Sequence, residues 1–278
     1  MRALLAKGVV AVSAVLIAGS GGGDTAGPTS AASRIAAARS GELGHFFAPP
    51  PPDRAHSFYF TRAAYSSGRF GGFGGRGGGG GSWATDYPKA DQQFLVVLRR
   101  LTNLDALPYE HPVQLDDPEL RRYPFIYTVE VGNMSLSESE VTALRSYLLA
   151  GGFMVADDFW GDYEWQAFEQ QMRRVFPEYG FVELPMDHPV MSSFYDVSEI
   201  IQVPNVGNAR TGFTSEKGGV VPHCRGIIDE KGRLLVVANW NTDLGDAWEW
   251  AEQPDYPLKY STYAYQMGVN FIVYAMSH

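Results

Sequence analysis

Two acidic segments hold the residues whose types and spacing could do chemistry. The first begins at Asp157 and the second at Asn241, each directly after an apolar run and each beside a tryptophan. Clustered carboxylates bind Mg²⁺ or Ca²⁺ through hard oxygen ligands, and tryptophan faces suit cations or sugar rings. Two carboxyl groups in unlike surroundings can also divide the roles of acid and base. The candidate ligand-binding residues of these segments are Asp157, Asp158, Trp160, Asn241, Asp243 and Asp246, and the four aspartates are also the candidate metal ligands.

The same aspartates have a structural alternative. Asp158 or Asp162 could cap the helix expected after the first segment, at its positively polarised end. For Asp162 we favour the cap, whereas for the pair Asp157 and Asp158 we narrowly favour a site. For Asp243 and Asp246 the two interpretations are balanced.

One histidine and the single cysteine are weaker candidates. His188 joins Asp157 and Asp158 as a candidate catalytic residue, and a loop-capping role is equally compatible with its surroundings. Cys224 precedes a predicted strand, whereas a nucleophile elbow places the reactive side chain after a strand and before a helix. The position of Cys224 therefore argues against a catalytic thiol.

Alternating strands and helices must position these residues. The hydrophobic patterns predict strands over 57–62, 124–131, 153–156 and 199–203, a hairpin of 226–229 with 233–238, and helices over 88–101, 163–175 and 261–276, with another helix starting at a capping box of Ser137 and Glu140. This order predicts an α/β fold: a doubly wound, mostly parallel sheet with helices on both faces and a late hairpin. Loops at the carboxyl ends of parallel strands converge on one crevice. Arg62, which ends the first strand, is therefore a further ligand-binding candidate, and both acidic segments share that edge if the strand at 233–238 runs parallel.

Composition limits the partners and the chemistry. The chain has 278 residues, of which 45 % are hydrophobic, and we expect one α/β domain over 57–278. Its 22 basic and 31 acidic residues give a net charge of −9, which argues against a nucleic-acid partner. A single cysteine excludes an intrachain disulfide. The stretch 68–81 contains 10 glycines and predicts a mobile surface loop.

The N-terminus has the pattern of an exported protein. Arg2 and Lys7 precede an apolar run and then small residues, which is the order of a secretory signal peptide, here over 1–26. The apolar run is about half of the roughly 20 residues that a spanning helix needs, so no membrane span is expected after cleavage. Ser20 stands where a lipobox would carry its lipid-accepting cysteine, so we expect a periplasmic or extracellular protein and not a lipoprotein. Residues 27–56 predict an Ala/Pro-rich flexible linker.

Several segments together resemble the bacterial family called domain of unknown function 4159. They are Trp83-x-x-Asp86-Tyr87-Pro88, Leu148-x-x-Gly151-Gly152-Phe153, Asp157-Asp158-Phe159-Trp160-Gly161, Asp187-His188-Pro189, Asn241-x-Asp243-x-Gly245-Asp246 and Gly268-Val269-Asn270-Phe271-x-x-Tyr274-Ala275. The resemblance covers about 57–278 and implies a flavodoxin-like fold similar to that of class I glutamine amidotransferases. Enzymes of that fold carry a cysteine at the turn after a central strand. The comparable turn here contains Asp157 and Asp158, so the resemblance does not extend to cysteine amidotransferase activity.

Three functions from different classes follow from these observations. The favoured one is an exported binding module, and not an enzyme, that takes a small molecule, a glycan or a divalent cation such as Mg²⁺ or Ca²⁺ at the acidic crevice. The first alternative is a hydrolase, metal-assisted or not, with Asp157 or Asp158 as base and His188 or Asp243 assisting. The second alternative is a module that binds another protein of the cell envelope. The sequence leaves the ligand and the oligomeric state undetermined.

Overall fold

The computed structural model describes residues 55–68 and 82–278. The expected signal peptide, nearly all of the linker and almost the whole glycine-rich stretch lie outside the described residues. The elements in chain order are β1 (Thr61–Ala64), η2 (Ser82–Ala84), α2 (Lys89–Leu101), β2 (His111–Gln114), η3 (Pro118–Arg122), β3 (Phe125–Val129), η4 (Val131–Asn133), α3 (Glu138–Leu149), β4 (Phe153–Phe159), α4 (Gly161–Val175), β5 (Phe181–Glu183), η5 (Pro189–Met191), α5 (Val206–Thr211), β6 (His223–Ile228), β7 (Leu234–Trp240), α6 (Leu244–Glu249) and α7 (Leu258–Ser277).

The strands form one seven-stranded sheet in the order β2-β1-β3-β4-β7-β6-β5. The neighbours from β2 to β7 are parallel, whereas β6 runs antiparallel to both β7 and β5. The five parallel strands thus follow the order 2-1-3-4-5 of flavodoxin-like folds. The predicted α/β class and the late hairpin are confirmed. Because β7 runs parallel to β4, both acidic segments leave the sheet at the same edge.

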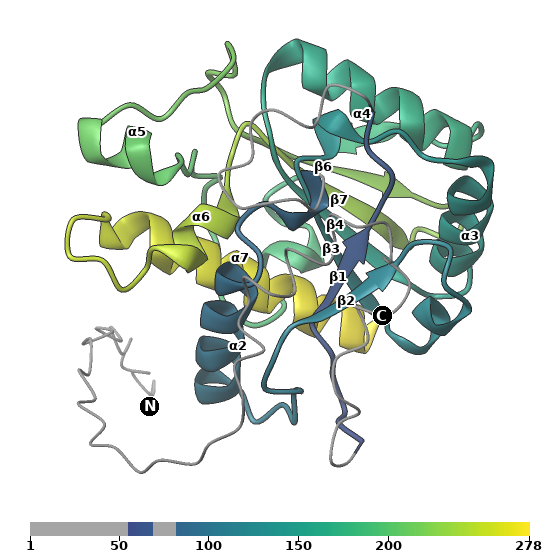
Figure 1. The fold of residues 1–278 in the computed structure, drawn as a ribbon, viewed down its shortest axis with the longest axis horizontal. Helices are drawn as coiled ribbons and strands as arrows, with labels where there is room; N and C mark the ends of the chain where they lie inside the picture. Colours follow the sequence, from purple (N-terminus) through teal and green to yellow (C-terminus); the bar gives the residue numbers. More distant parts are fainter. Residues whose placement is uncertain (1–54, 69–81) are drawn as a thin grey trace, which may run out of the picture.

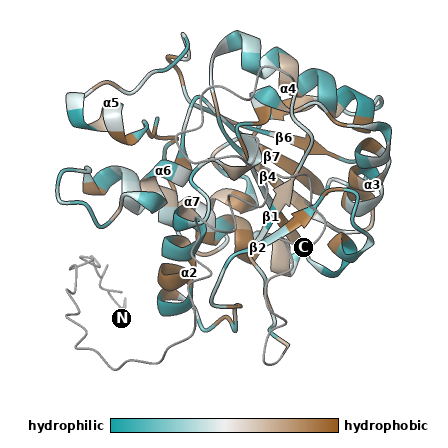
Figure 2. Ribbon diagram, in the orientation of Figure 1, coloured by the Kyte–Doolittle hydropathy of each residue, from teal (hydrophilic) through white to brown (hydrophobic). Residues whose placement is uncertain are grey.

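Helices cover both faces of the sheet, as Figure 1 shows. Successive strand residues point to opposite faces, so β4 contributes to two separate hydrophobic cores. Phe153 and Val155 pack in the core beneath α2, α6 and α7. Met154 and Ala156 pack in the core beneath α3 and α4. In Figure 2 the strands are mostly brown while α4 has a hydrophilic outer side, as expected for a sheet buried between amphipathic helices.

Local sequence sets how the chain enters β4, the strand that carries the first acidic segment. The capping box of Ser137 and Glu140 is present at the start of α3. After α3, the chain turns through Gly151, whose φ is +116°, and then passes the ring of Tyr147. A Cβ at Gly152 would lie 2.3 Å from that ring, so only glycine fits there. The turn from α3 into β4 therefore needs both glycines, Gly151 for its positive φ and Gly152 for the close approach to Tyr147.

The predicted strand over 199–203 is wrong. Both sides of β7 are already paired, with β4 and β6, so the sheet offers no edge at this place. The segment instead crosses the end of β7 as irregular chain: Val203 N donates to Thr242 Oγ1 at 3.0 Å and Gln202 Nε2 donates to the Asn241 carbonyl oxygen at 3.2 Å. The first strand is displaced from the predicted 57–62: β1 starts at Thr61 and continues to Ala64, and Phe58 forms only an isolated bridge with Ala106.

Helix α7 uses one buried amide to order a distant loop. Asn270 is fully buried, and its Oδ1 accepts hydrogen bonds from the backbone N–H groups of Phe194 and Tyr195. Its Nδ2 donates to the carbonyl oxygens of Met191 and Tyr195. Although α7 has 20 residues, no helix within the described ranges is long and apolar enough to cross a membrane.

His111 should make stability depend on pH. Its ring lies 5.2 Å from the ring of Tyr59 and 4.5 Å from that of Tyr123, and neither nitrogen has a hydrogen-bond partner among the described residues. Burial lowers the pKa of His111 to about 4. The unfolded chain binds this proton near its ordinary pKa of about 6.5, so stability is highest above that pH and falls as the pH drops towards 4. We expect this group to account for a loss of about 2 kcal/mol, less than the full shift would give because the ring keeps some contact with solvent.

The measurement compares unfolding by denaturant at about pH 7.5 and about pH 4.5. His111→Phe, which keeps an aromatic ring among Tyr59 and Tyr123, should lose less stability over this interval than the wild type. His278→Gln, at an exposed position, should keep the wild-type dependence. An unchanged pH dependence in His111→Phe would contradict the prediction.

Candidate functional site

The two acidic segments touch each other at the carboxyl ends of β4 and β7. Asp157 and Asp158 lie near the end of β4, while Asp243 and Asp246 lie at the start of the short helix α6 that follows β7. The backbones meet directly, since Asp158 N donates to the carbonyl oxygen of Thr242 at 3.2 Å. The structure therefore brings the four aspartates of the predicted site together, but it gives them different roles.

Asp157 anchors α6 to the sheet. The residue is fully buried, and its Oδ2 accepts hydrogen bonds from the Tyr127 hydroxyl at 2.7 Å and from the N–H groups of Leu244 at 2.9 Å and Gly245 at 3.1 Å. Burial raises the pKa of Asp157 to about 7, against the effect of these donors. Asp157 thus satisfies the first N–H groups of α6 and has no surface to offer a ligand.

Asp243 and Asp246 are also tied to the start of α6. Asp243 is its N-cap, with Oδ1 accepting from Asp246 N at 2.8 Å. Asp246 accepts through Oδ2 from the N–H of Val206 at 2.5 Å. The structural alternative therefore applies in part, but each carboxylate has a second oxygen beyond the one engaged by backbone.

The cap expected from Asp162 is wrong. The N-cap of α4 is Trp160, and neither Asp158 nor Asp162 caps this helix with its side chain. Glu164 and Asn241 satisfy the helix start instead: Glu164 Oε2 accepts from Trp160 N at 2.7 Å, and Asn241 Oδ1 accepts from Gly161 N at 2.8 Å. Glu164, within α4, and Asn241, directly after β7, therefore replace the cap that the sequence suggested.

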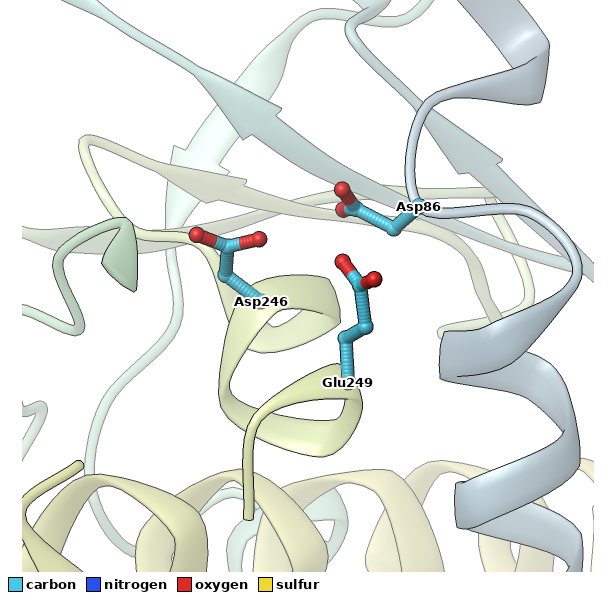
Figure 3. A group of neighbouring side chains, drawn as sticks. All are labelled: Asp86, Asp246 and Glu249. Carbon is cyan, nitrogen blue, oxygen red and sulfur yellow. The ribbon is translucent and has the colours of Figure 1, made fainter. Parts of the chain in front are cut away.

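Two acidic residues that the sequence analysis did not select complete the site. Asp86 lies between η2 and α2 at a φ of +60°, and Glu249 stands on α6. The ligand oxygens of Asp86, Asp158 and Asp243 all lie within 4.8 Å of one another, and so do those of Asp86, Asp246 and Glu249. We call these residues the carboxylate cluster: Asp86, Asp158, Asp243, Asp246 and Glu249. Figure 3 shows the carboxyl groups of its second set pointing toward one another.

Asp86 is the residue common to both sets, and one of its oxygens has no partner. Oδ2 of Asp86 is buried and makes no hydrogen bond within the described chain. A signal for Glu249 existed, because it follows Asp246 by three residues and so shares a helix face with it. No periodic pattern surrounds Asp86, and only its membership in the Trp83-to-Pro88 motif could have drawn attention to it.

Arg62 holds the segment that carries Asp86. The side chain is fully buried, and its Nε and Nη2 donate to the carboxylate of Asp91, which is buried as well. Its Nη1 donates to the carbonyl oxygens of Trp83 at 3.0 Å and Thr85 at 2.8 Å. Arg62 lies inside β1 and does not end it as predicted, and these bonds engage its guanidinium, so the structure places it behind the site.

Electrostatic repulsion is strong within the cluster. Burial comes first among the causes that raise the pKa of each of the five carboxyl groups, and neighbouring carboxylates raise the pKa of Asp86, Asp158, Asp243 and Glu249 further. None of the five forms an ion pair with a Lys, Arg or His of residues 55–68 or 82–278. Lys217 pairs with Glu164 at 2.6 Å instead, and Lys89 Nζ stacks over the Trp250 ring at 4.1 Å.

Trp160 and Asn241 frame the cluster. The buried indole of Trp160 donates through Nε1 to Asp158 Oδ1 at 3.0 Å. The Asn241 amide joins two segments, since its Oδ1 accepts from Gly161 N and its Nδ2 donates to the Val221 carbonyl oxygen at 2.7 Å. Both predicted residues therefore lie at the site, and both are occupied in holding its shape.

His188 and Cys224 are not brought to the cluster. His188 is the N-cap of η5, where Nδ1 accepts from Val190 N, and its ring lies 5.9 Å from that of Tyr274 in α7. The ring of Tyr274 lies 5.4 Å from that of Phe153, at the start of β4, whereas the cluster lies at the other end of that strand. Cys224 is buried in β6, and burial raises the pKa of its thiol.

The geometry of the cluster suits a hard divalent cation. Calcium binds oxygens at about 2.3–2.6 Å, so ligands on opposite sides of the ion lie about 5 Å apart. The spacing of 4.8 Å within each set falls inside this limit. Asp86, Asp158 and Glu249 are only partly buried, which leaves an ion a way in from solvent.

The fold and this site define a mostly parallel α/β domain with a carboxylate cluster at its strand ends. The chain belongs to the family "Domain of unknown function (DUF4159)", whose family model matches residues 73–276. The matched range contains Asp86 and both acidic segments, and it confirms the resemblance noted in the sequence. A comparison with curated proteins gave no match.

Proposed function

We propose that the protein is an exported domain that binds a divalent cation of the Ca²⁺ or Mg²⁺ type at the carboxylate cluster. The observation that carries the proposal is the convergence of five acidic side chains from β4, α6 and the segment before α2, without an ion-pair partner in the described chain. Bringing like charges together in a partly buried place costs free energy, and the attraction of a bound cation offsets this cost. Export rests on the signal-peptide pattern of residues 1–26.

A cation fits the cluster better than a glycan does. Sugar recognition uses an open aromatic face, and Trp160 and Trp248 beside the cluster are each about 1 % exposed. The ring of Trp250 is covered by the charged ends of Lys89 and Arg210. What the cluster offers instead is carboxylate oxygen, the ligand that hard divalent cations prefer.

The binding proposal also fits better than hydrolysis with Asp157 as base. Asp157 is fully buried, and its Oδ2 accepts hydrogen bonds from three donors. A general base must come within hydrogen-bond reach of the proton that it removes. His188, the suggested assisting residue, lies beside Tyr274, which packs on Phe153 at the opposite end of β4 from the cluster. We further infer a relationship to the class I glutamine amidotransferase-like fold, supported by the 2-1-3-4-5 order of the parallel strands.

Calorimetric titration of the purified protein with Ca²⁺, Mg²⁺ and Mn²⁺ tests the proposal. We expect saturable binding of at least one of these ions, and Asp86→Asn should weaken it by at least about tenfold, which is about 1.4 kcal/mol. Asp162→Asn is the matched control, because Asp162 is exposed on α4 and lies outside the cluster. The proposal is wrong if the wild type binds none of the three ions, or if Asp86→Asn binds them as tightly as the wild type.

A further inference from the structure

Asp86 belongs to two sets of ligands that share no other member. One set adds Asp158 at the end of β4 and Asp243 shortly after β7, and the other adds Asp246 and Glu249 from α6. A carboxylate has two oxygens and can bind a different ion with each of them. Asp86 therefore stands where a bridging ligand between two ions would stand.

The carboxyl group of Asp86 faces both sets at once. Figure 3 shows it directed toward Asp246 and Glu249. On the side of the other set, a Cβ placed on Gly245 would lie 2.8 Å from Asp86 Oδ2 and 3.5 Å from Asp243 Oδ1. Because residue 245 is glycine, Asp86 Oδ2 can lie where a Cβ would crowd it, on the same side of Gly245 as Asp243 Oδ1.

The unpartnered oxygen of Asp86 points to a ligand independently of the number of acids. Oδ2 is buried and has no hydrogen-bond donor within the described chain, although a buried polar atom normally has one. A buried oxygen that nothing pairs with destabilises the folded state, because it has lost its hydrogen bonds to water. A bound cation would pair with it directly.

Charge balance favours two ions over one. The five carboxylates of the cluster carry five negative charges when ionised. A single divalent cation would leave a charge of −3 on the five carboxylates, whereas two such cations leave −1, and the protein cations Lys89 and Arg62 act on the cluster without an ion pair to it. Paired divalent ions in proteins stand about 3.5–4 Å apart, a separation that a bridging carboxylate spans.

We propose that the carboxylate cluster holds two divalent cations bridged by Asp86, one bound with Asp158 and Asp243 and the other with Asp246 and Glu249. This inference rests on the proposed function, and it adds the second ion and the bridge. It also assigns Gly245 a purpose, which is to leave room for the bridging carboxylate between the two ions.

Titration of the full-length protein with Mn²⁺, followed by native mass spectrometry and electron paramagnetic resonance, tests the bridge. We expect two Mn²⁺ per chain, and their magnetic coupling at about 4 Å should remove the six-line spectrum of isolated Mn²⁺. Uncoupled binding of two ions, or saturation at one ion, would overturn the bridge while leaving the proposed function standing. Absence of any bound Mn²⁺, Ca²⁺ or Mg²⁺ would overturn both.

Three conservative variants assign the ions to their ligands. Glu249→Gln and Asp243→Asn should each lose one of the two ions and restore the six-line spectrum of the other, and asparagine at 243 can still cap α6. Asp86→Asn should lose the coupling in every case, with weaker binding at both positions. Circular dichroism of each variant shows whether it is folded, and Asp162→Asn should keep both ions and the coupling. Retention of the coupled pair in Asp86→Asn would overturn the inference.

Discussion

Replacing Arg62 by methionine is expected to destabilise the protein by about 3–5 kcal/mol, because it leaves a buried charge without its partner. Arg62 and Asp91 are both fully buried, and their closest contact, between Nη2 and Oδ1, is 2.5 Å. Burial raises the pKa of Asp91 although the Arg62 guanidinium opposes this shift, so the carboxylate depends on that one cation. Arg62→Met also removes the donor of two backbone carbonyls. Unfolding by denaturant measures the loss.

The double variant Arg62→Met/Asp91→Leu separates the charge effect from the packing effect. When both charges are replaced by apolar groups of similar size, most of the lost stability should return. Arg62→Met alone must then be less stable than the double variant. Equal stability of the two variants would show that the ion pair is not the cause of the loss.

The same pair of variants tests the link between Arg62 and the site. The carbonyl oxygens of Trp83 and Thr85 lose their donor in the double variant as well, so the segment that carries Asp86 loses its support in both. We therefore expect the double variant to regain stability and still bind divalent cations more weakly than the wild type. Recovery of both properties would mean that Arg62 does not position Asp86.

Much of the fold could be predicted because its signals are local. The apolar runs of β3, β4 and β7, the capping box at Ser137 and the turn at Gly151 each depend on a few adjacent residues. The alternation of strands and helices predicted a mostly parallel sheet but left the direction of β7 as a condition, which the structure meets. That direction places both acidic segments at one edge.

The rest of the site depends on partners that are distant in sequence. Asp86 reaches the cluster because Arg62 in β1 holds the carbonyl oxygens of Trp83 and Thr85 just before it, and pairs with Asp91 of α2, 29 residues further along the chain. In the same way, Asn241 rather than Asp162 satisfies the start of α4, at a separation of 80 residues from Gly161. No pattern in the sequence encodes such contacts, because hydrogen bonds between distant segments follow from the packing of the sheet and not from local propensity.

Glu249→Gln is expected to raise the stability of the cation-free protein and to lower the stability of the cation-bound protein, each relative to the wild type. Without cations, the charge of Glu249 repels that of Asp246, and burial with this repulsion raises the pKa of Glu249. Removing the charge should therefore stabilise the cation-free protein by about 0.5–1 kcal/mol. With Ca²⁺ at about 100 times its dissociation constant, the wild type should gain about 2.7 kcal/mol from each ion that it binds, because the ions bind only the folded state. The variant should lose the contribution of the ion that Glu249 binds.

Thermal unfolding in a chelator and in excess Ca²⁺ gives the four values that this prediction needs. A variant that is more stable than the wild type in chelator but less stable in Ca²⁺ has lost a ligand for the ion together with a repulsive charge. This result is expected if Glu249 serves ion binding at the expense of stability. A residue kept for packing would behave otherwise, since its replacement would lower stability under both conditions. The crossing of the two stability orders is therefore the decisive result. Asp162→Asn, which removes an exposed acidic charge from α4, should show no crossing.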